Sequence, residues 1–431
     1  MSESEPRPDQ ATLFVNASQV VTCAGPARAR RGSEMNDAGI RTDVGVAVTG
    51  GEIAAVDVVS SLRQRFHNAR EIDCRRGVLT PGLVDSHTHG IFGRPRFDEQ
   101  ELRAAGLDYM EIARRGGGIH SSVRDLRARS EDALVDLARE RLRRLASFGT
   151  TTIEVKSGYG LTLDDELKTL RVIARLSREL TLRIIPTFLG AHEIPLEHRG
   201  SPAARQEYVN ILINEMIPVV AAKGLARFAD VFCETGVYTV DESRTILTAA
   251  RDAGLLLKLH ADELTSSGGA ALAASLGATS ADHLAAISDD GIAALSHSST
   301  VATLLPGTML FLGKTKNAPA RRLIEAGIAV ALATDFNPGT SPTPNLPLVL
   351  TLGVSQLHLS VAEVVVAATV NGASALSVAD HVGQIAPGFS ADLALFDIRD
   401  VRELPYWYGD NRCTATYVRG KPCYTSDLPV T

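Results

Sequence analysis

Between Leu83 and about residue 335, short apolar segments alternate with amphipathic segments of helical periodicity. Residues 131–149 and 205–224 are predicted helices, and residues 151–160, TTIEVKSGYG, are a predicted strand followed by a loop. Strand and helix in alternation favour parallel strands joined by helical crossovers. Because the pattern recurs close to eight times, it predicts an α/β fold, a TIM-like (β/α)₈ barrel.

The two ends of the chain have a different pattern, with short strands and little helical periodicity. Residues 11–23 are predicted as one strand, residues 24–41 as a loop, and residues 44–56 as a hairpin around Thr49-Gly50-Gly51. Short strands return near the C-terminus. We therefore expect a small discontinuous β-domain, built from residues 1–80 and 384–431, beside a barrel of residues 81–383.

Composition excludes several classes of function. The formal net charge is −6 and no long basic run occurs, which argues against a nucleic-acid-binding surface. The five cysteines include no C-x-x-C pair, so neither a disulfide framework nor a thiolate zinc site is expected. The N-terminus lacks an apolar signal core and no apolar run could cross a bilayer, so we expect a cytoplasmic protein without a membrane partner.

The polar residues of chemical interest follow predicted strands. His87 and His89 end the stretch GLVDSHTHG, and residues i and i+2 of a strand point to the same face. The other candidates are His192 in LGAHE, His260 and Glu263 in LHADE, His283 in SADHL, and Asp335 in ATDFN. Because the carboxyl ends of barrel strands form one face, which carries the active site, we expect these side chains to converge there.

The sequence predicts a metal centre at this face, with His87, His89, His260 and Asp335 as ligands. Three imidazoles and one carboxylate suit zinc or iron, and either ion lowers the pKa of a bound water from ~16 toward ~7. Glu263, His283 and Asp335 are candidates for proton transfer, and spacing does not rank their roles.

A second metal would require a bridging lysine. Lys156 precedes a Ser-Gly-Tyr-Gly loop and Lys258 shares a strand face with His260, and neither makes a strong case. We therefore expect a single ion.

The same face should carry groups that recognise a substrate. Arg96 could bind a substrate carboxylate with both arms of its guanidinium, and Tyr109 and Tyr159 could donate hydroxyls to the same anion. The turn after Asp335 would present Asn337, Gly339 and Thr340 to a ligand. The glycine-rich run at residues 116–119 lacks the strand–helix context of a phosphate-binding loop, so no nucleotide site is predicted.

The motifs PGLVDSHTH, HADE and ATDFNPG resemble the metal-dependent amidohydrolase superfamily, and EVKSGYGL, FLGAHEIP and DVFCETGVY extend the resemblance to its imidazolonepropionase family. The resemblance implies a hydrolase of histidine degradation that opens the ring of 4-imidazolone-5-propanoate to N-formimidoyl-L-glutamate by metal-activated water. It also implies a homodimer. The implied substrate contacts are Arg96, Tyr159, His192, Glu263, Asn337, Gly339 and Thr340.

Two alternatives stay open. Another amidohydrolase, such as a purine or pyrimidine deaminase, would use the same metal without needing Arg96 for a carboxylate. A barrel that had lost catalysis could serve as a binding scaffold, but such a chain is expected to lose metal ligands, and here all four candidates are present.

Overall fold

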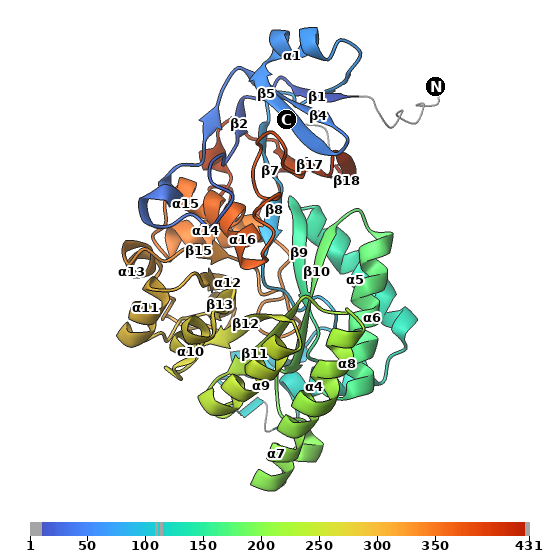
Figure 1. Ribbon diagram of the computed structural model, residues 1–431, viewed down its shortest axis with the longest axis vertical. Helices are drawn as coiled ribbons and strands as arrows, with labels where there is room; N and C mark the ends of the chain where they lie inside the picture. The colour runs from blue at the N-terminus through green and yellow to red at the C-terminus, as the bar shows by residue number, and fades with distance from the viewer. Residues whose placement is uncertain (1–10, 108–110, 113–114, 427–431) are drawn as a thin grey trace.

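The computed structural model describes residues 11–107, 111–112 and 115–426. Within them, eight parallel strands form one sheet in which strands consecutive in sequence are neighbours (Figure 1). These strands are β8 (Leu83–Asp85), β9 (Thr150–Lys156), β10 (Arg183–Ala191), β11 (Phe228–Cys233), β12 (Leu256–Ala261), β13 (Ser280–His283), β14 (Val301–Leu304) and β15 (Val330–Leu332).

Backbone pairing just beyond the first and last strands closes this sheet into a barrel. Thr88 and Phe336 form a parallel bridge, and the His89 amide donates to the Phe336 carbonyl at 2.8 Å. The Asp335 amide donates to the His87 carbonyl at 3.0 Å. The (β/α)₈ barrel predicted from the alternation of strands and helices is therefore confirmed.

Helices surround the barrel (Figure 1), and the longer ones bury an apolar face against it. In α5, Ser130 caps the first turn by accepting from the Ala133 amide, and Leu134, Val135, Ala138 and Leu142 are buried. The helices that follow β8 in the described part of the chain are α2 (Asp98–Ala104), α4 (Ile119–Arg127), α5 (Glu131–Ala146), α6 (Leu163–Glu179), α7 (Pro202–Ile211), α8 (Ile217–Ala222), α9 (Val240–Asp252), α10 (Gly269–Leu276), α11 (Asp289–Ser296), α12 (Pro306–Phe311), α13 (Ala320–Glu325), α14 (Leu346–Ser355), α15 (Val361–Ala367) and α16 (Val370–Ala375). Short 3₁₀ turns lie at Leu196–His198 and Val401–Glu403.

The single helix predicted over residues 205–224 is interrupted. Helix α7 passes through a π-helical segment, Leu212–Met216, before α8 begins. Pro218 lies in the first turn of α8 and has no amide hydrogen to donate to the preceding turn. The wider π-helical turn keeps the chain helical although the proline cannot donate to that turn.

Strands from both chain ends share one sheet of order β18-β17-β16-β7-β2-β3, which lies above the barrel in Figure 1. Antiparallel pairing of Leu393 with Pro81 and of Phe396 with Val78 joins the C-terminal strands to the N-terminal ones, as predicted. The members are β2 (Gln19–Val21), β3 (Ile40–Arg41), β7 (Val78–Pro81), β16 (Leu393–Phe396), β17 (Cys413–Val418) and β18 (Lys421–Thr425).

A second, four-stranded sheet comes from the N-terminal region alone, in the order β5-β4-β1-β6. It contains the predicted hairpin, and its elements are β1 (Thr12–Val15), β4 (Val44–Thr49), β5 (Glu52–Val58) and β6 (Arg70–Asp73), with α1 (Val59–Arg65) after β5. The single strand predicted over residues 11–23 is wrong: Asn16, at φ 59°, turns the chain so that β1 and β2 enter different sheets.

The predicted loop over residues 24–41 is also more ordered than expected. It holds a 3₁₀ turn, Gly32–Asn36, and strand β3, and it buries Met35 and Ala38.

Gly82 joins the small sheet to the barrel between β7 and β8. Its amide donates to the Asp392 carbonyl at 2.8 Å, and a Cβ there would lie 2.1 Å from Thr151 Oγ1 and 2.7 Å from Thr151 Cβ. Only glycine fits this approach. The domain boundaries at residues 80 and 383 stay a prediction.

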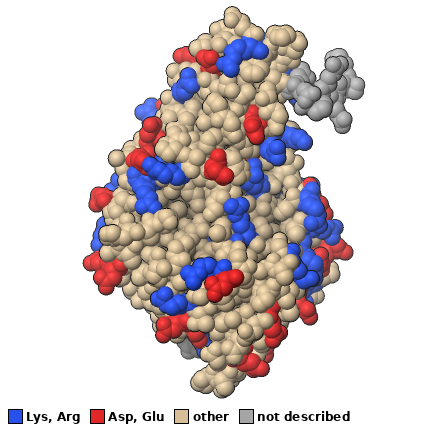
Figure 2. Space-filling view, in the orientation of Figure 1, with Lys and Arg blue, Asp and Glu red and all other residues tan. Residues whose placement is uncertain are grey.

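No helix among the described residues is both long and apolar enough to traverse a lipid bilayer. On the face shown in Figure 2, basic and acidic side chains are interspersed.

Replacing Gly82 with alanine should lower the free energy of unfolding by about 1–3 kcal/mol, because the added methyl overlaps the branched Thr151 side chain. Urea unfolding monitored by circular dichroism measures the change. The control is Gly200→Ala, where a Cβ would meet nothing within 4 Å and a change within about 0.5 kcal/mol is expected. Equal free energies of unfolding for Gly82→Ala and Gly200→Ala would contradict close packing of Gly82 against Thr151.

Candidate metal centre

Four side chains from three separated parts of the chain converge at the carboxyl ends of the barrel strands. His87 Nε2 lies 3.2 Å from His89 Nε2, which lies 3.4 Å from His260 Nε2. Asp335 Oδ1 lies 3.4 Å from His89 Nε2 and 3.6 Å from His87 Nε2. All four residues are buried. The structure thus brings together every residue of the expected ligand set.

These separations fit a shared cation. Burial lowers the pKa of His87 and of His89 well below the usual value, so both imidazoles are neutral. Neutral imidazole nitrogens and a carboxylate oxygen this close together are the donor types that bind zinc or iron. Ligands about 2.0–2.1 Å from one tetrahedral ion are about 3.3 Å apart, close to the distances found here.

Other histidines at this face offer alternative ligand groups. His87, His260 and His283 form one set of mutually close donors, and His89, His192 and His260 form another. His192 Nδ1 lies 2.9 Å from the Gly158 carbonyl, and its ring stacks on His89 at 5.0 Å between centroids. Geometry alone therefore places His192 and His283 beside the ion site without fixing which histidines bind.

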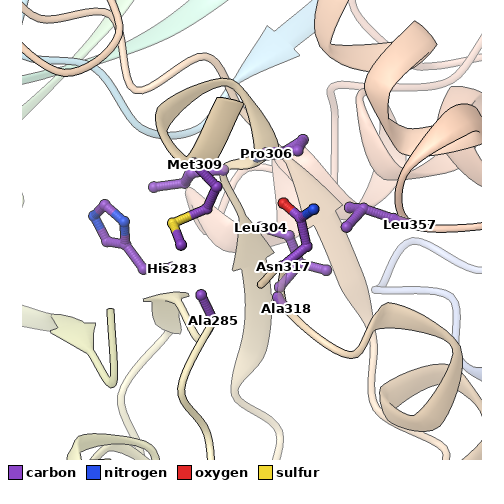
Figure 3. Close-up of a pocket in the computed structure, with 9 residues that line it drawn as sticks. His283, Ala285, Leu304, Pro306, Met309, Asn317, Ala318 and Leu357 are labelled. Atoms are coloured by element: carbon purple, nitrogen blue, oxygen red, sulfur yellow. The ribbon is translucent and has the colours of Figure 1, made fainter. Parts of the chain in front are cut away.

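Glu263 and His283 are paired at the rim of the centre. His283 Nδ1 lies 3.6 Å from Glu263 Oε2. Burial and the charge of Asp335 raise the pKa of Glu263 well above its usual value, which favours the protonated form of this carboxyl group. His283 also lines a pocket that reaches past Met309 towards Asn317 and Leu357 (Figure 3).

Asp335 divides its two oxygens between different partners. Oδ1 faces the histidines, while Oδ2 accepts from Thr308 Oγ1 at 2.6 Å. Burial raises its pKa to about 6. The hydroxyl of Thr308, which sequence reasoning did not single out, thus orients this carboxylate.

The turn after Asp335 uses its own amide groups internally. Asn337 Oδ1 accepts from the amides of Gly339 and Thr340, at 2.8 and 2.7 Å. Asn337 Nδ2 donates to the Asp335 carbonyl and to Thr340 Oγ1. Asn337 therefore organises the turn, and contacts from this turn to a substrate stay a prediction.

Arg96 is buried beside this turn. Its Nε lies 3.5 Å from Glu99 Oε1, and its Nη1 has no hydrogen-bond partner among the described residues. A Cβ at Gly339 would lie 1.4 Å from Arg96 Nη2, so glycine makes room for the guanidinium. A buried guanidinium with a spare donor is suited to binding an anion.

Tyr159 lies in a loop whose backbone amides are held by Glu166. Its ring is buried, 5.3 Å from that of His192. The Glu166 carboxylate accepts from the amides of Gly158, Gly160 and Leu161 at 2.8–3.1 Å. Tyr109, the other candidate tyrosine, lies outside the described residues.

Sequence reasoning missed two carboxylates behind the histidines. Asp282 Oδ2 lies 2.6 Å from His87 Nδ1, and Asp230 Oδ2 lies 2.9 Å from His260 Nδ1. Asp230 sits inside the otherwise apolar strand FADVFC, and a charged residue within such a strand is the signal that could have found it. Asp282 lies in the polar strand SADH, which carries no such signal.

Comparison with known proteins is consistent with this geometry. The model of the amidohydrolase family matches residues 98–424. The imidazolonepropionase of Geobacillus kaustophilus is 45% identical over 95% of this chain and 97% of its own length, and that of Symbiobacterium thermophilum is 46% identical over 95% and 96%.

Among solved structures, an adenosine deaminase from Xanthomonas campestris with bound zinc has a TM-score of 0.71 at 19% identity and covers 99% of this chain and 96% of its own. The guanine deaminase of E. coli has a TM-score of 0.74 at 15% identity, covering 97% and 99%. At these identities the likeness concerns the fold alone. The family match and the full-length relatives decide the class: the chain is a hydrolytic enzyme that belongs to the amidohydrolase family and, within it, to the imidazolonepropionases.

Proposed function

We propose that this enzyme hydrolyses the ring of 4-imidazolone-5-propanoate to N-formimidoyl-L-glutamate, a reaction of histidine degradation. Full-length relatives at 45–46% identity carry the name of that activity. The observation that carries the proposal is Arg96, whose buried guanidinium has an unpaired Nη1 donor among the described residues. A propanoate is the anion this group would bind.

His87, His89, His260 and Asp335 are proposed to hold one ion, zinc or iron. Four distances among these donors, between 3.2 and 3.6 Å, support this set, and the groups that include His192 or His283 stay alternatives. When bound, such an ion polarises a carbonyl and lowers the pKa of a bound water. The donor set suits both metals and does not choose between them.

The neighbouring side chains would handle the protons. Water adds to the ring carbonyl carbon, and the bond from that carbon to the ring nitrogen breaks. Asp335, held by Thr308, is placed to accept the proton that the water loses. Glu263, protonated in its buried position, can donate to the departing nitrogen, and His283 beside it can orient the carbonyl.

Arg96 and its surroundings argue for this substrate over a purine or pyrimidine base. The folds of deaminases overlap this chain closely, so fold does not discriminate between the two. A neutral base without an acceptor for Arg96 would leave its buried Nη1 donor unpaired, which is costly. We also propose a cytoplasmic homodimer, as expected for the family.

The direct test is to incubate freshly generated imidazolone propionate with metal-loaded protein and to follow the loss of its ultraviolet absorbance. We expect turnover, with N-formimidoyl-L-glutamate identified by mass spectrometry. Adenine, guanine and cytosine should release no ammonia under the same conditions. Ammonia release from a base, with no loss of the imidazolone, would favour the deaminase.

Replacing Arg96 with methionine should raise KM for the propanoate substrate at least about 30-fold, because the carboxylate loses a buried charged partner. Steady-state kinetics measure it. Arg94→Met is the matched control, since the Arg94 side chain is exposed and lies two residues away. A KM shared by both variants and the parent would refute the role of Arg96.

Replacing His89 with alanine should remove most of the bound metal, because His89 Nε2 lies within 3.4 Å of three other donors. Metal content per chain after dialysis, measured by plasma mass spectrometry, is the readout. His381→Ala, at an exposed histidine, should keep the parent's content. A His89→Ala protein with the parent's metal content would show that another group of donors binds the ion.

A further inference from the structure

Five charged side chains lie inside the barrel, beneath the histidines of the metal centre. Every one has a side chain that is 0% exposed. They are Glu154 and Lys156 of β9, Asp230 of β11, Lys258 of β12 and Asp282 of β13. Bulky apolar residues usually fill this space in such barrels, so five buried charges call for a physical reason.

Two lysines tie the three carboxylates together. Lys156 Nζ donates to Asp230 Oδ2 at 2.7 Å and to Glu154 Oε1 at 3.0 Å. Lys258 Nζ donates to Glu154 Oε2 at 3.0 Å and to the Ser86 carbonyl at 2.8 Å. Asp282 Oδ2 lies between both ammonium groups, at 3.5 Å from Lys258 and 3.8 Å from Lys156.

Two of these carboxylates also contact the metal-centre histidines. Asp282 Oδ2 lies 2.6 Å from His87 Nδ1, and Asp230 Oδ2 lies 2.9 Å from His260 Nδ1. Asp230 Oδ1 accepts from the His260 backbone amide at 3.1 Å. The side-chain contact with His87 is a hydrogen bond, and that with His260 is an ion-pair distance without hydrogen-bond geometry. A carboxylate at Nδ1 favours the imidazole proton on that side and leaves the Nε2 lone pair for a ligand. Both Nε2 atoms face the proposed ion position.

The two-residue repeat of a β-strand explains why the charged side chains lie directly beneath the histidines. Lys258 and His260 are two residues apart on β12 and therefore point to the same side of the sheet. The lysine lies one step deeper in the barrel than the histidine. Three carboxyl groups and two ammonium groups thus lie directly under the imidazoles.

We infer that Lys156, Lys258, Asp230 and Asp282 are positioning residues for the metal: the lysines hold the two aspartates, and the aspartates fix His260 and His87 with Nε2 directed at the ion. The inference rests on the metal-binding part of the proposed function and is independent of the substrate. A purely structural role would make the layer matter for folding but not for metal affinity.

The first test compares two buried aspartates. Asp282→Asn keeps the side-chain shape but removes the charge behind His87, and we expect metal to bind 10–100-fold more weakly, as is usual for such outer partners. Competition between the protein and a chromophoric chelator for zinc measures the dissociation constant. Asp392→Asn is the matched control, since Asp392, directly before β16, is buried and paired at 3.3 Å with Arg183 at the start of β10.

The second test removes a lysine. Lys258→Met should weaken zinc binding at least about tenfold, whereas Lys168→Met, which breaks a partly buried pair with Asp165, should leave it unchanged. Circular dichroism establishes that each variant is folded. Folded Asp282→Asn and Lys258→Met proteins with the parent's zinc affinity would overturn the inference, even if ring opening is confirmed.

A measurement on the unaltered, metal-free protein covers the case in which a variant does not fold. Nitrogen-15 spectra of the histidine rings, assigned with single-histidine variants, should show His87 and His260 protonated at Nδ1. Rings protonated at Nε2 would contradict the role of the two aspartates. Either result stands whether or not the enzyme acts on the imidazolone.

Discussion

The short backbone ladder between residues 85–89 and 334–336 is the interaction on which the site depends. Asp85 accepts from the amide and the hydroxyl of Thr334, a residue 249 positions later in the chain. The amides of His89 and Asp335 complete the pairing. Without this ladder the first and last barrel strands would be open edges, and Asp335 would not face His87 and His89.

The closed barrel then creates an interior that must satisfy its own charges. Glu154, Lys156 and Lys258 have no solvent to bind, so each is stable only because the others are present. Removing one partner of a buried pair costs more than the pair contributes, because the remaining charge is left uncompensated. The same mutual dependence holds the aspartates against the histidine rings, and it gives those rings a single orientation before any ion arrives.

Local patterns in the sequence were enough to predict the barrel and the converging histidines. The two-residue spacing places His87 and His89 on one face of a strand. His260 and Asp335 are identified because each lies at the end of a predicted strand. Local patterns do not predict contacts between strands that are distant in sequence. Asp282 reaches His87 only because β13 and β8 both face the barrel interior. The turn at Asn16 was missed because a left-handed residue within an apolar run leaves little trace in periodicity.

The proposed substrate-binding groups lie beside the same backbone ladder as the proposed metal centre. The Arg96 amide donates to the Pro338 carbonyl at 3.0 Å, and Arg103 Nη2 donates to the Gly339 carbonyl at 2.9 Å. The loop after β8 is thus tied to the turn after β15, directly beyond the ladder that aligns the metal donors. Since the proposed reaction requires Arg96 and the metal centre to keep a fixed separation, one continuous stretch of paired backbone would serve both. The proposed anion contact lies in these two loops and not in the barrel strands, so substrate choice can change there while the barrel beneath them stays the same.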